Sequence, residues 1–382
     1  MPHGHSSPKL DLDAILRDPA IRIVVCCGAG GVGKTTTAAA LALRAAEQYG
    51  RRTVVLTIDP ARRLAQSMGL TELDNKPRPV TGAEAANGGA LDAMMLDMKR
   101  TFDEVVLAHS TPQQAKEIFA NPFYQAMSST FAGTQEYMAM EKLSQLSATG
   151  NWDLIVVDTP PSRSALDFLD APKRLAKFLD SRMLRILMTP ARAGGLSVLK
   201  MVGSSLNLFG RAMNRILGAQ LLSDVSTFVT SLNSMFGGFS ERATRTYQVL
   251  QAKQTAFLVV ATPEPDAIRE AGYFAGRLSE ERMPLAGLVL NRVHALGVPL
   301  SAERSVAAAE ALAAAKPAKS SAVTAEVLLL HADLVRQVAR EQRVADRFRR
   351  SHPAVPVTEV PAQPQDVHDL VGLRGISEAL TA

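Results

Sequence analysis

The sequence predicts an α/β protein in which a mostly parallel central sheet is flanked by helices. Three observations support this: short runs rich in β-branched residues recur along the 382-residue chain, helix-forming segments separate them, and an acidic or polar residue ends several runs. Strands joined through helices run parallel, so their carboxyl ends gather at one edge of the sheet, where ligands bind. The length and the 47% content of hydrophobic residues suffice for one large domain with an insertion or for two medium domains.

The first elements are expected to be a strand, a helix and a second strand. Residues Ile21–Cys27 form a β-branched run, and Thr35–Tyr49 consists of helix formers followed by Gly50, where a C-cap glycine belongs. The next apolar run, Thr53–Asp59, completes the unit. This order is typical of the start of a parallel sheet.

Four later runs continue the predicted sheet. They are Trp152–Pro161, Thr255–Glu264, Leu285–Val293 and Ala354–Pro361, and helices are expected around Asp266–Glu280 and near Asp366–Leu380. The residues expected beyond the carboxyl ends of the strands are Gly28, Asp59, Asp158, Pro263 and Asn291. These positions are the first candidates for a functional site.

Two long segments lack strand character and are expected to form a helical insertion subdomain, at about residues 94–149 and 166–254. In the second segment, apolar residues recur every three or four positions from Val198 to Phe236. This apolar face either packs against the rest of the protein or a partner subunit, or is exposed and binds a hydrophobic client or a membrane surface. Both alternatives remain open from the sequence.

The remaining features narrow the cellular setting. Residues 1–20 are expected to be a polar tail and lead-in to one domain over residues 21–382, and Ser301–Ala325 is expected to form surface helices or a linker. The tail lacks the apolar core of a secretory signal, and no run reaches the roughly 18 apolar residues of a spanning helix. The adjacent Cys26 and Cys27 can neither staple a loop nor hold a metal alone. We expect a cytoplasmic protein, either free or peripheral to the inner face of the membrane.

The stretch "GAGGVGKTTTAAALA" fits a phosphate-binding loop. Its pattern Gly28-x-x-x-x-Gly33-Lys34-Thr35 lies between a predicted strand and a predicted helix. Glycines let backbone N–H groups turn towards phosphates, Lys34 can reach the β- and γ-phosphates, and the Thr35 hydroxyl can hold Mg²⁺. The sequence therefore predicts a P-loop NTPase that binds ATP or ADP with Mg²⁺ through Gly28, Ala29, Gly30, Gly31, Val32, Gly33, Lys34, Thr35 and Thr36.

Two aspartates at predicted strand ends complete this chemistry. Asp158 follows the apolar run "LIVV", where a carboxylate can hold Mg²⁺ or its water shell together with Thr35. Asp59 ends the second strand, where a carboxylate can orient and deprotonate the attacking water. Either aspartate alone could be a helix cap or a surface residue. Beside the loop, Asp59 and Lys34 become the catalytic candidates, and Asp158 and Thr35 the metal ligands.

Several motifs together resemble the arsenite-pump and tail-anchored-protein-targeting ATPase family, a branch of P-loop proteins with a deviant loop. The resemblance covers nearly the whole chain and rests on "GGVGKTTTAAALA", "DPARRL" from Asp59, "DTPPSRSALDFL" from Asp158, "TPEPDAIREA" from Thr262 and "LVLNR" from Leu288. It implies ATP hydrolysis by a dimer, with Asp59 activating water and Asn291 contacting adenine. It also implies that the "PAQP" turn from Pro361 packs on the base.

Three departures from the family pattern bear on function. Family members usually carry a lysine at the position of Ala29, and that lysine reaches the partner's nucleotide across the dimer. This chain cannot donate that charge, although Arg62, Arg63 or Arg163 could substitute locally. The second switch reads Ser162–Ala165 where the family has Thr-Gly-His-Thr. The zinc-binding and arsenite-binding cysteines of family members are absent, so we expect neither a zinc site nor arsenite transport.

The predicted function is a Mg²⁺-dependent ATPase whose nucleotide cycle rearranges a dimer and moves the helical insertion. The alternative is a weakly hydrolysing subunit that pairs with a lysine-bearing paralogue, but the retained Lys34, Thr35, Asp59 and Asp158 favour hydrolysis. A heterodimer is preferred to a homodimer because the partner's lysine could enter this site. A partition-type, DNA-associated ATPase is disfavoured, because it would not need long apolar insertions. The formal net charge of +5 is also spread thinly over the chain, so it does not imply nucleic acid.

Overall fold

A computed structural model describes residues 7–59, 63–70, 73–122, 124–125, 134–160, 244–314 and 319–381. The chain divides into two compact units. The first comprises Met1–Met95, Gly150–Ala165 and Leu250–Ala382, and the second comprises Leu96–Thr149 and Leu166–Val249. The first unit contains the sheet and every residue of the predicted phosphate site.

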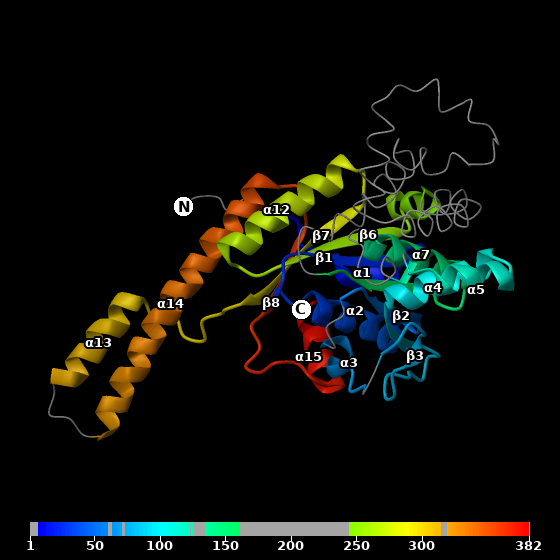
Figure 1. Ribbon diagram of the computed structural model, residues 1–382. Helices are drawn as coiled ribbons and strands as arrows, with labels where there is room; N and C mark the ends of the chain where they lie inside the picture. Colours follow the sequence, from blue (N-terminus) through cyan, green and yellow to red (C-terminus); the bar gives the residue numbers. More distant parts are fainter. Residues whose placement is uncertain are drawn as a thin grey trace, which may run out of the picture. The chain divides into compact units, whose positions relative to one another are not determined.

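Within the described residues, an eight-stranded sheet forms the centre of the first unit (Figure 1). In chain order its strands are β1 (Ile23–Cys27), β2 (Arg52–Thr57), β3 (Arg78–Pro79), β4 (Ala90–Met95), β5 (Leu154–Asp158), β6 (Thr255–Ala261), β7 (Leu285–Val293) and β8 (Val357–Pro361). Their spatial order is β3-β4-β2-β5-β1-β6-β7-β8, and every neighbouring pair is parallel except β3 and β4. The predicted mostly parallel sheet is confirmed.

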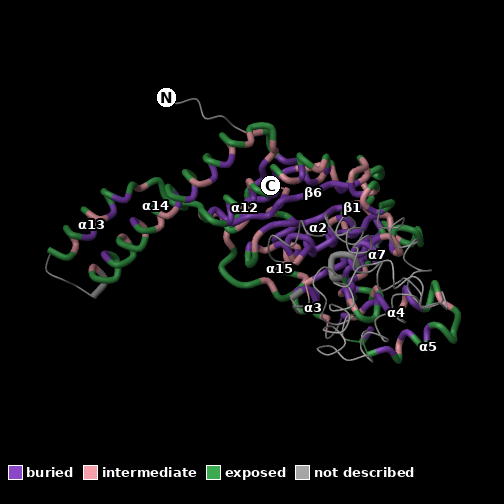
Figure 2. Tube along the Cα trace, turned by 45° about the horizontal axis from the view of Figure 1, so that its top comes forward, coloured by how far each residue is buried: buried purple, intermediate pink, exposed green. Residues whose placement is uncertain are grey.

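Helices cover both faces of this sheet (Figure 1). α2 (Lys34–Tyr49) packs against β1, β2, β4 and β5, and three further helices pack against α2: α1 (Leu12–Arg17), α3 (Arg63–Ser67) and α15 (Leu370–Ala379). The other face carries α12 (Pro265–Glu280) on β6 and β7, and α14 (Lys319–Ser351) beside α12 and β7. α13 (Ala302–Ala314) packs along α14. Figure 2 shows the buried strands between these helices.

The first crossover helix lies where the sequence predicts it. α2 begins at Lys34, and its buried residues are mostly alanine and leucine, which allow close packing on the sheet. Gly50 ends the helix in the left-handed conformation, with φ of 65°, and its amide donates to the Ala46 carbonyl at 3.2 Å. Glycine adopts this conformation without a steric penalty, which explains the residue at this position.

The segment before β1 is held by Arg51, although the sequence predicts only a polar lead-in there. Arg51 is 7% exposed. Its guanidinium donates to the carbonyls of Leu16, Asp18, Ile21 and Asp153 at distances of 2.6 to 3.3 Å. Burial lowers the pKa of Arg51, and these four carbonyls compensate for the lost water. The lead-in is therefore ordered by a cation that the sequence places after α2.

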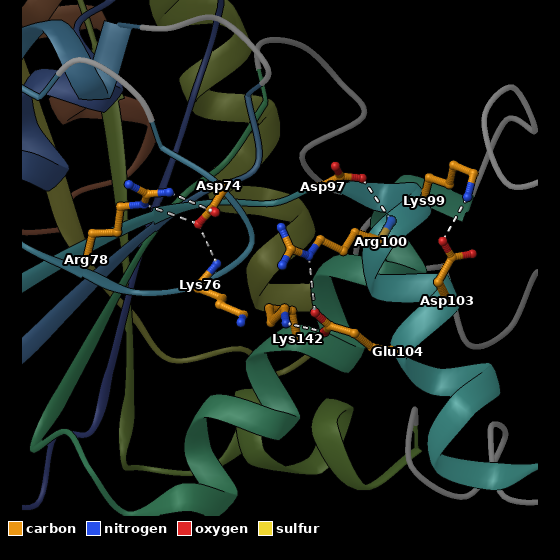
Figure 3. Close-up of polar contacts among 9 residues, drawn as sticks. All are labelled: Asp74, Lys76, Arg78, Asp97, Lys99, Arg100, Asp103, Glu104 and Lys142. Carbon is orange, nitrogen blue, oxygen red and sulfur yellow. Dashed lines mark hydrogen bonds and ion pairs between the residues drawn. The ribbon is translucent and has the colours of Figure 1, made fainter.

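The described part of the second unit contains α4 (Met98–His109), α5 (Pro112–Ala120) and α7 (Thr134–Thr149). α4 packs against both α5 and α7. The Asp97 carboxylate caps α4 by accepting from the Arg100 amide at 2.9 Å, and Lys142 of α7 donates to Glu104 of α4 at 2.7 Å (Figure 3). The predicted apolar face from Val198 to Phe236 lies outside the described residues.

The sequence does not predict β3, β4 or the length of α14. β4, "ALDAMM", has no β-branched residue and carries Asp92, whose carboxylate accepts from the Trp152 Nε1 at 2.7 Å. β4 ends at Met95 and the second unit begins at Leu96, whereas the first insertion is predicted from about residue 94. The two-residue β3 includes Arg78, which pairs with Asp74 at 3.0 Å (Figure 3). α14 has 33 residues, and the preceding Lys-Pro-Ala-Lys break conceals its start in the sequence.

Candidate active site

The loop between β1 and α2 has the backbone of a phosphate cradle. Its glycines Gly28, Gly31 and Gly33 have φ values of 150°, 78° and 94°, a region that residues with a Cβ rarely adopt. At Gly28 a Cβ would lie 2.1 Å from the Val260 carbonyl oxygen, so β6 leaves no room for a side chain. The predicted glycine loop therefore follows the end of a buried strand and leads into a helix N-terminus, as phosphate binding requires.

Gly28→Ala is expected to cost more than about 3 kcal/mol of unfolding free energy, because its Cβ would collide with backbone rather than with a movable side chain. Gly31→Ala is the matched control: its φ is also positive, but nothing lies within 4 Å of the added Cβ. There we expect about 1 to 2 kcal/mol from backbone strain alone. Urea unfolding of both variants measures the difference, and equal costs would contradict the close approach of the loop to β6.

Lys34 is buried at the first position of α2. The side chain is 6% exposed, and its Nζ donates to the Ala29 carbonyl across the loop at 2.7 Å. Burial lowers the pKa of Lys34, and the negative charges of Asp158 and Asp59 oppose that shift. The predicted catalytic lysine and both predicted aspartates thus lie close enough to interact electrostatically.

Asp158 ends β5 and is fully buried. Its Oδ2 accepts from the Thr35 hydroxyl at 2.8 Å and from the Thr57 hydroxyl at 2.9 Å. Its Oδ1 has no hydrogen-bond partner among the described residues. Burial raises the pKa of Asp158 to about 6, although both hydroxyls and Lys34 act in the opposite direction.

A hard divalent cation fits this arrangement. A buried carboxylate oxygen without a partner is costly in a protein, and oxygen ligands are those that Mg²⁺ prefers. The Thr35 hydroxyl, which the sequence predicts as the second ligand, contacts the same carboxylate. In the described residues no cluster of three or more His, Cys, Asp or Glu side chains suitable for a metal is present.

Asp59 lies two residues beyond the last residue of β2 and is half-buried. Its amide donates to the Thr57 hydroxyl oxygen at 3.2 Å, and the same hydroxyl contacts Asp158. Thr57 therefore links the two predicted aspartates, a role that sequence analysis misses. No pattern in the sequence marks Thr57 for this role: it meets Asp158 because β2 lies beside β5, so the ends of the two strands are adjacent.

Asn291 approaches the phosphate loop from β7. Its Nδ2 donates to the Val32 carbonyl at 2.8 Å, and a Cβ on Gly33 would lie 2.2 Å from that nitrogen. Pro361 ends β8 and is in register with Val293 of β7. The sheet thus places both residues predicted to contact the base on neighbouring strands, while the contact with adenine stays a prediction.

The two cysteines are free and buried in β1. Burial raises the pKa of Cys26 well above its ordinary value and that of Cys27 to about 12, so both thiols stay protonated and unreactive. The predicted substitute Arg62 and the altered second switch, Ser162–Ala165, lie outside the described residues, as does the side chain of Arg63. No helix in the described ranges is long and apolar enough to cross a membrane.

The chain is similar in sequence to a family of ATPases and to individual proteins named as ATPases. Residues 21–299 match the family model of the anion-transporting ATPases. The chain is 24% identical over 289 residues to ATPase ASNA1 homolog 1 of Paramecium tetraurelia, an alignment that covers 74% of this chain and 78% of that protein. It is 31% identical over 171 residues to ATPase GET3 of Malassezia globosa, covering 44% of this chain and 47% of that protein.

Proposed function

This chain belongs to the anion-transporting ATPase family, and from that premise we propose that it is a Mg²⁺-dependent ATPase acting as one subunit of a heterodimer. Membership confirms the resemblance read from the motifs and makes the chain an ATPase. The metal, the residue roles and the partner belong to the proposal. Its main support is the contact between Thr35 of the phosphate loop and Asp158, whose second oxygen has no partner among the described residues.

In this proposal Thr35 and Asp158 hold the metal, directly or through its water shell. Mg²⁺, when bound, neutralises charge that develops on the β- and γ-phosphates during transfer. The loop amides from Gly28 to Thr36 cradle the phosphates, and the Lys34 ammonium moves from the Ala29 carbonyl to the β- and γ-phosphates. These groups supply positioning and charge stabilisation, which account for most of the catalysis of phosphoryl transfer.

Asp59 is proposed to accept the proton of the attacking water. Its position beyond β2 and its influence on the pKa of Lys34 and Asp158 support a place beside the phosphate chain. A carboxylate in hydrogen-bond reach of water can orient it and take its proton as the phosphoryl group is transferred.

Ala29 supports a heterodimer in place of a homodimer. Ala29 lies in the phosphate loop, is half-exposed, and cannot carry charge towards a partner's nucleotide. A cation supplied across an interface can raise the rate of phosphoryl transfer by about 10³- to 10⁵-fold. A paralogous subunit with lysine at this position would supply that cation to the nucleotide of this chain. A homodimer with slow hydrolysis is the alternative.

The proposal extends to the helical subdomain and to the location of the protein. We place the conformational response to nucleotide in the predicted insertions at about residues 94–149 and 166–254. The apolar face predicted there either packs against the protein itself or a partner subunit, or binds a hydrophobic client or a membrane surface. Two buried free thiols without a disulfide support a reducing compartment, the cytoplasm.

Phosphate release by purified chains tests the proposal. We expect slow hydrolysis by this chain alone and at least about a tenfold rise when a lysine-bearing paralogue is added, because the partner's cation completes the site. Ala29→Lys should raise the rate of the chain alone, since two copies can then exchange lysines across a homodimer. Ala29→Met, of similar length and without charge, is the control. Equal rates for the chain alone, the mixture and Ala29→Lys would contradict the heterodimer.

A further inference from the structure

Glu341 is a buried carboxylate on α14. It forms hydrogen bonds with the residue that follows β7, the strand that carries Asn291. It is 8% exposed, whereas its neighbours Arg340 and Gln342 are exposed. Its Oε2 accepts from the His294 amide at 3.0 Å, and its Oε1 lies 2.7 Å from the His294 Nδ1. The His294 Nδ1 donates to this oxygen in the tautomer that carries the ring proton on Nδ1. The Gln337 side chain donates to the same Oε1 at 2.9 Å.

The Glu341 carboxylate therefore contacts both the backbone amide and the imidazole ring of His294. Burial of a carboxylate is costly unless its oxygens are hydrogen-bonded, and both oxygens are used at this position. Gln337 lies one turn earlier on α14 and orients the carboxylate. An ion pair on the protein surface does not require a buried carboxylate with both oxygens hydrogen-bonded, as Glu341 has.

The segment that Glu341 holds is short and under backbone strain. Arg292, between Asn291 and His294, has a φ of 60°, which a residue with a Cβ adopts at an energetic cost. The Arg292 amide donates to the Asn291 Oδ1 at 3.0 Å, while the Asn291 Nδ2 donates to the Val32 carbonyl of the phosphate loop. Such a conformation persists only where contacts on both sides impose it. Here those contacts are the phosphate loop on one side and, on the other, Glu341 together with the pairing of Val293 with β8.

We propose that Glu341 is a positioning residue for the nucleotide: by fixing His294 it sets the end of β7, and with it the Asn291 amide beside the phosphate loop. This inference rests on the proposed ATP site. Glu341 does not touch the phosphates in this scheme. It sets the geometry of the strand end on which the base is bound, so its removal weakens binding of ligands that carry a base and spares binding of those that do not.

Two ligands separate this role from a merely structural one. ATP carries a base, and inorganic tripolyphosphate offers the same loop three phosphates without one. Calorimetric titration of the full-length chain with Mg²⁺ and each ligand is the measurement. For Glu341→Ala we expect affinity for ATP to fall about tenfold and affinity for tripolyphosphate to change less than about twofold. Glu341→Gln, which keeps an oxygen that accepts from the His294 amide, should restore most of the affinity for ATP.

Two further variants complete the test. Glu326→Ala removes an exposed carboxylate from the same helix and should change neither affinity. His294→Ala removes the ring contact from a side chain that is 37% exposed, so it remains informative even if Glu341→Ala does not fold. It should reproduce the selective loss of ATP affinity.

The outcomes separate the inference from the function on which it rests. Equal losses for ATP and tripolyphosphate, or no loss for Glu341→Ala and His294→Ala, would overturn the positioning role while leaving the ATP site intact. Failure of the unsubstituted chain to bind ATP would overturn the proposed function and the positioning role together.

Discussion

Lys34→Met reduces ATP hydrolysis by about 10²- to 10³-fold, with phosphate release as the measurement. The expected size is that of losing one preorganised charged donor from a site where charge develops in the transition state. Methionine keeps the length and the apolar stem of lysine, so the buried space at the start of α2 stays filled. The missing ammonium, and not a collapsed loop, then causes the loss.

The second unit supplies a matched control for this variant. Lys142 is as buried as Lys34, with 6% exposure, but it pairs with Glu104 of α4 and lies in no predicted site. Lys142→Met should lower the thermal stability, because the ion pair between Lys142 and Glu104 is lost, while turnover per folded molecule changes less than about threefold. A similar loss of turnover in both variants would contradict the role of Lys34.

Asp158→Asn is expected to lower ATP hydrolysis and to raise the unfolding free energy of the metal-free protein. It should abolish Mg²⁺-dependent hydrolysis, because asparagine lacks the charge that holds the metal. The same change should stabilise the metal-free protein at neutral pH. The pKa of Asp158 is raised by burial from 3.8 to about 6, so the ionised form at neutral pH weakens the fold by up to about 3 kcal/mol, two pKa units at 1.36 kcal/mol each.

The sign of this effect gives a pH test. Between about pH 4 and pH 6 the folded state binds a proton at Asp158 that the unfolded state has lost, so unfolding free energy from this group falls as pH rises through that window. Urea unfolding of the metal-free protein should show this fall for the unsubstituted chain and a flatter profile for Asp158→Asn. Added Mg²⁺ should stabilise only the unsubstituted chain above about pH 6. Parallel pH profiles for the two chains would contradict the burial of an ionised carboxylate.

The sequence locates the phosphate loop, the helix after it and the paired aspartates because each depends on short-range patterns. A β-branched run, a glycine pattern and a helix former follow one another directly in "IRIVVCCGAGGVGKTTT", and the structure confirms β1 and α2 there. β4 lacks that signature: it is formed from alanine, leucine, methionine and Asp92, and only its pairing with β2 and β3 identifies it as a strand.

The contacts that hold the site together are long-range, and no local pattern reveals them. Thr57 meets Asp158 because β2 and β5 are neighbours in the sheet, although they are distant in sequence. Glu341 meets His294 only once a 33-residue helix has packed beside β7. Sequence patterns can nominate the groups that act on phosphate, but the hydrogen bonds that orient them come from the order of strands.

The order of strands also determines when the sheet around β1 can form during synthesis. β1 does not pair with β2, which follows it in the chain: Ile23 lies between Ile155 of β5 and Thr255 of β6. At about 5–20 residues per second, roughly 10–50 s pass between translation of β1 and translation of β6. Until β5 is translated, the apolar strand "IVVCC" has two unpaired backbone edges, and one of them stays unpaired until β6 follows. The nascent chain, more than the finished ATPase, is where this sequence is most exposed to aggregation.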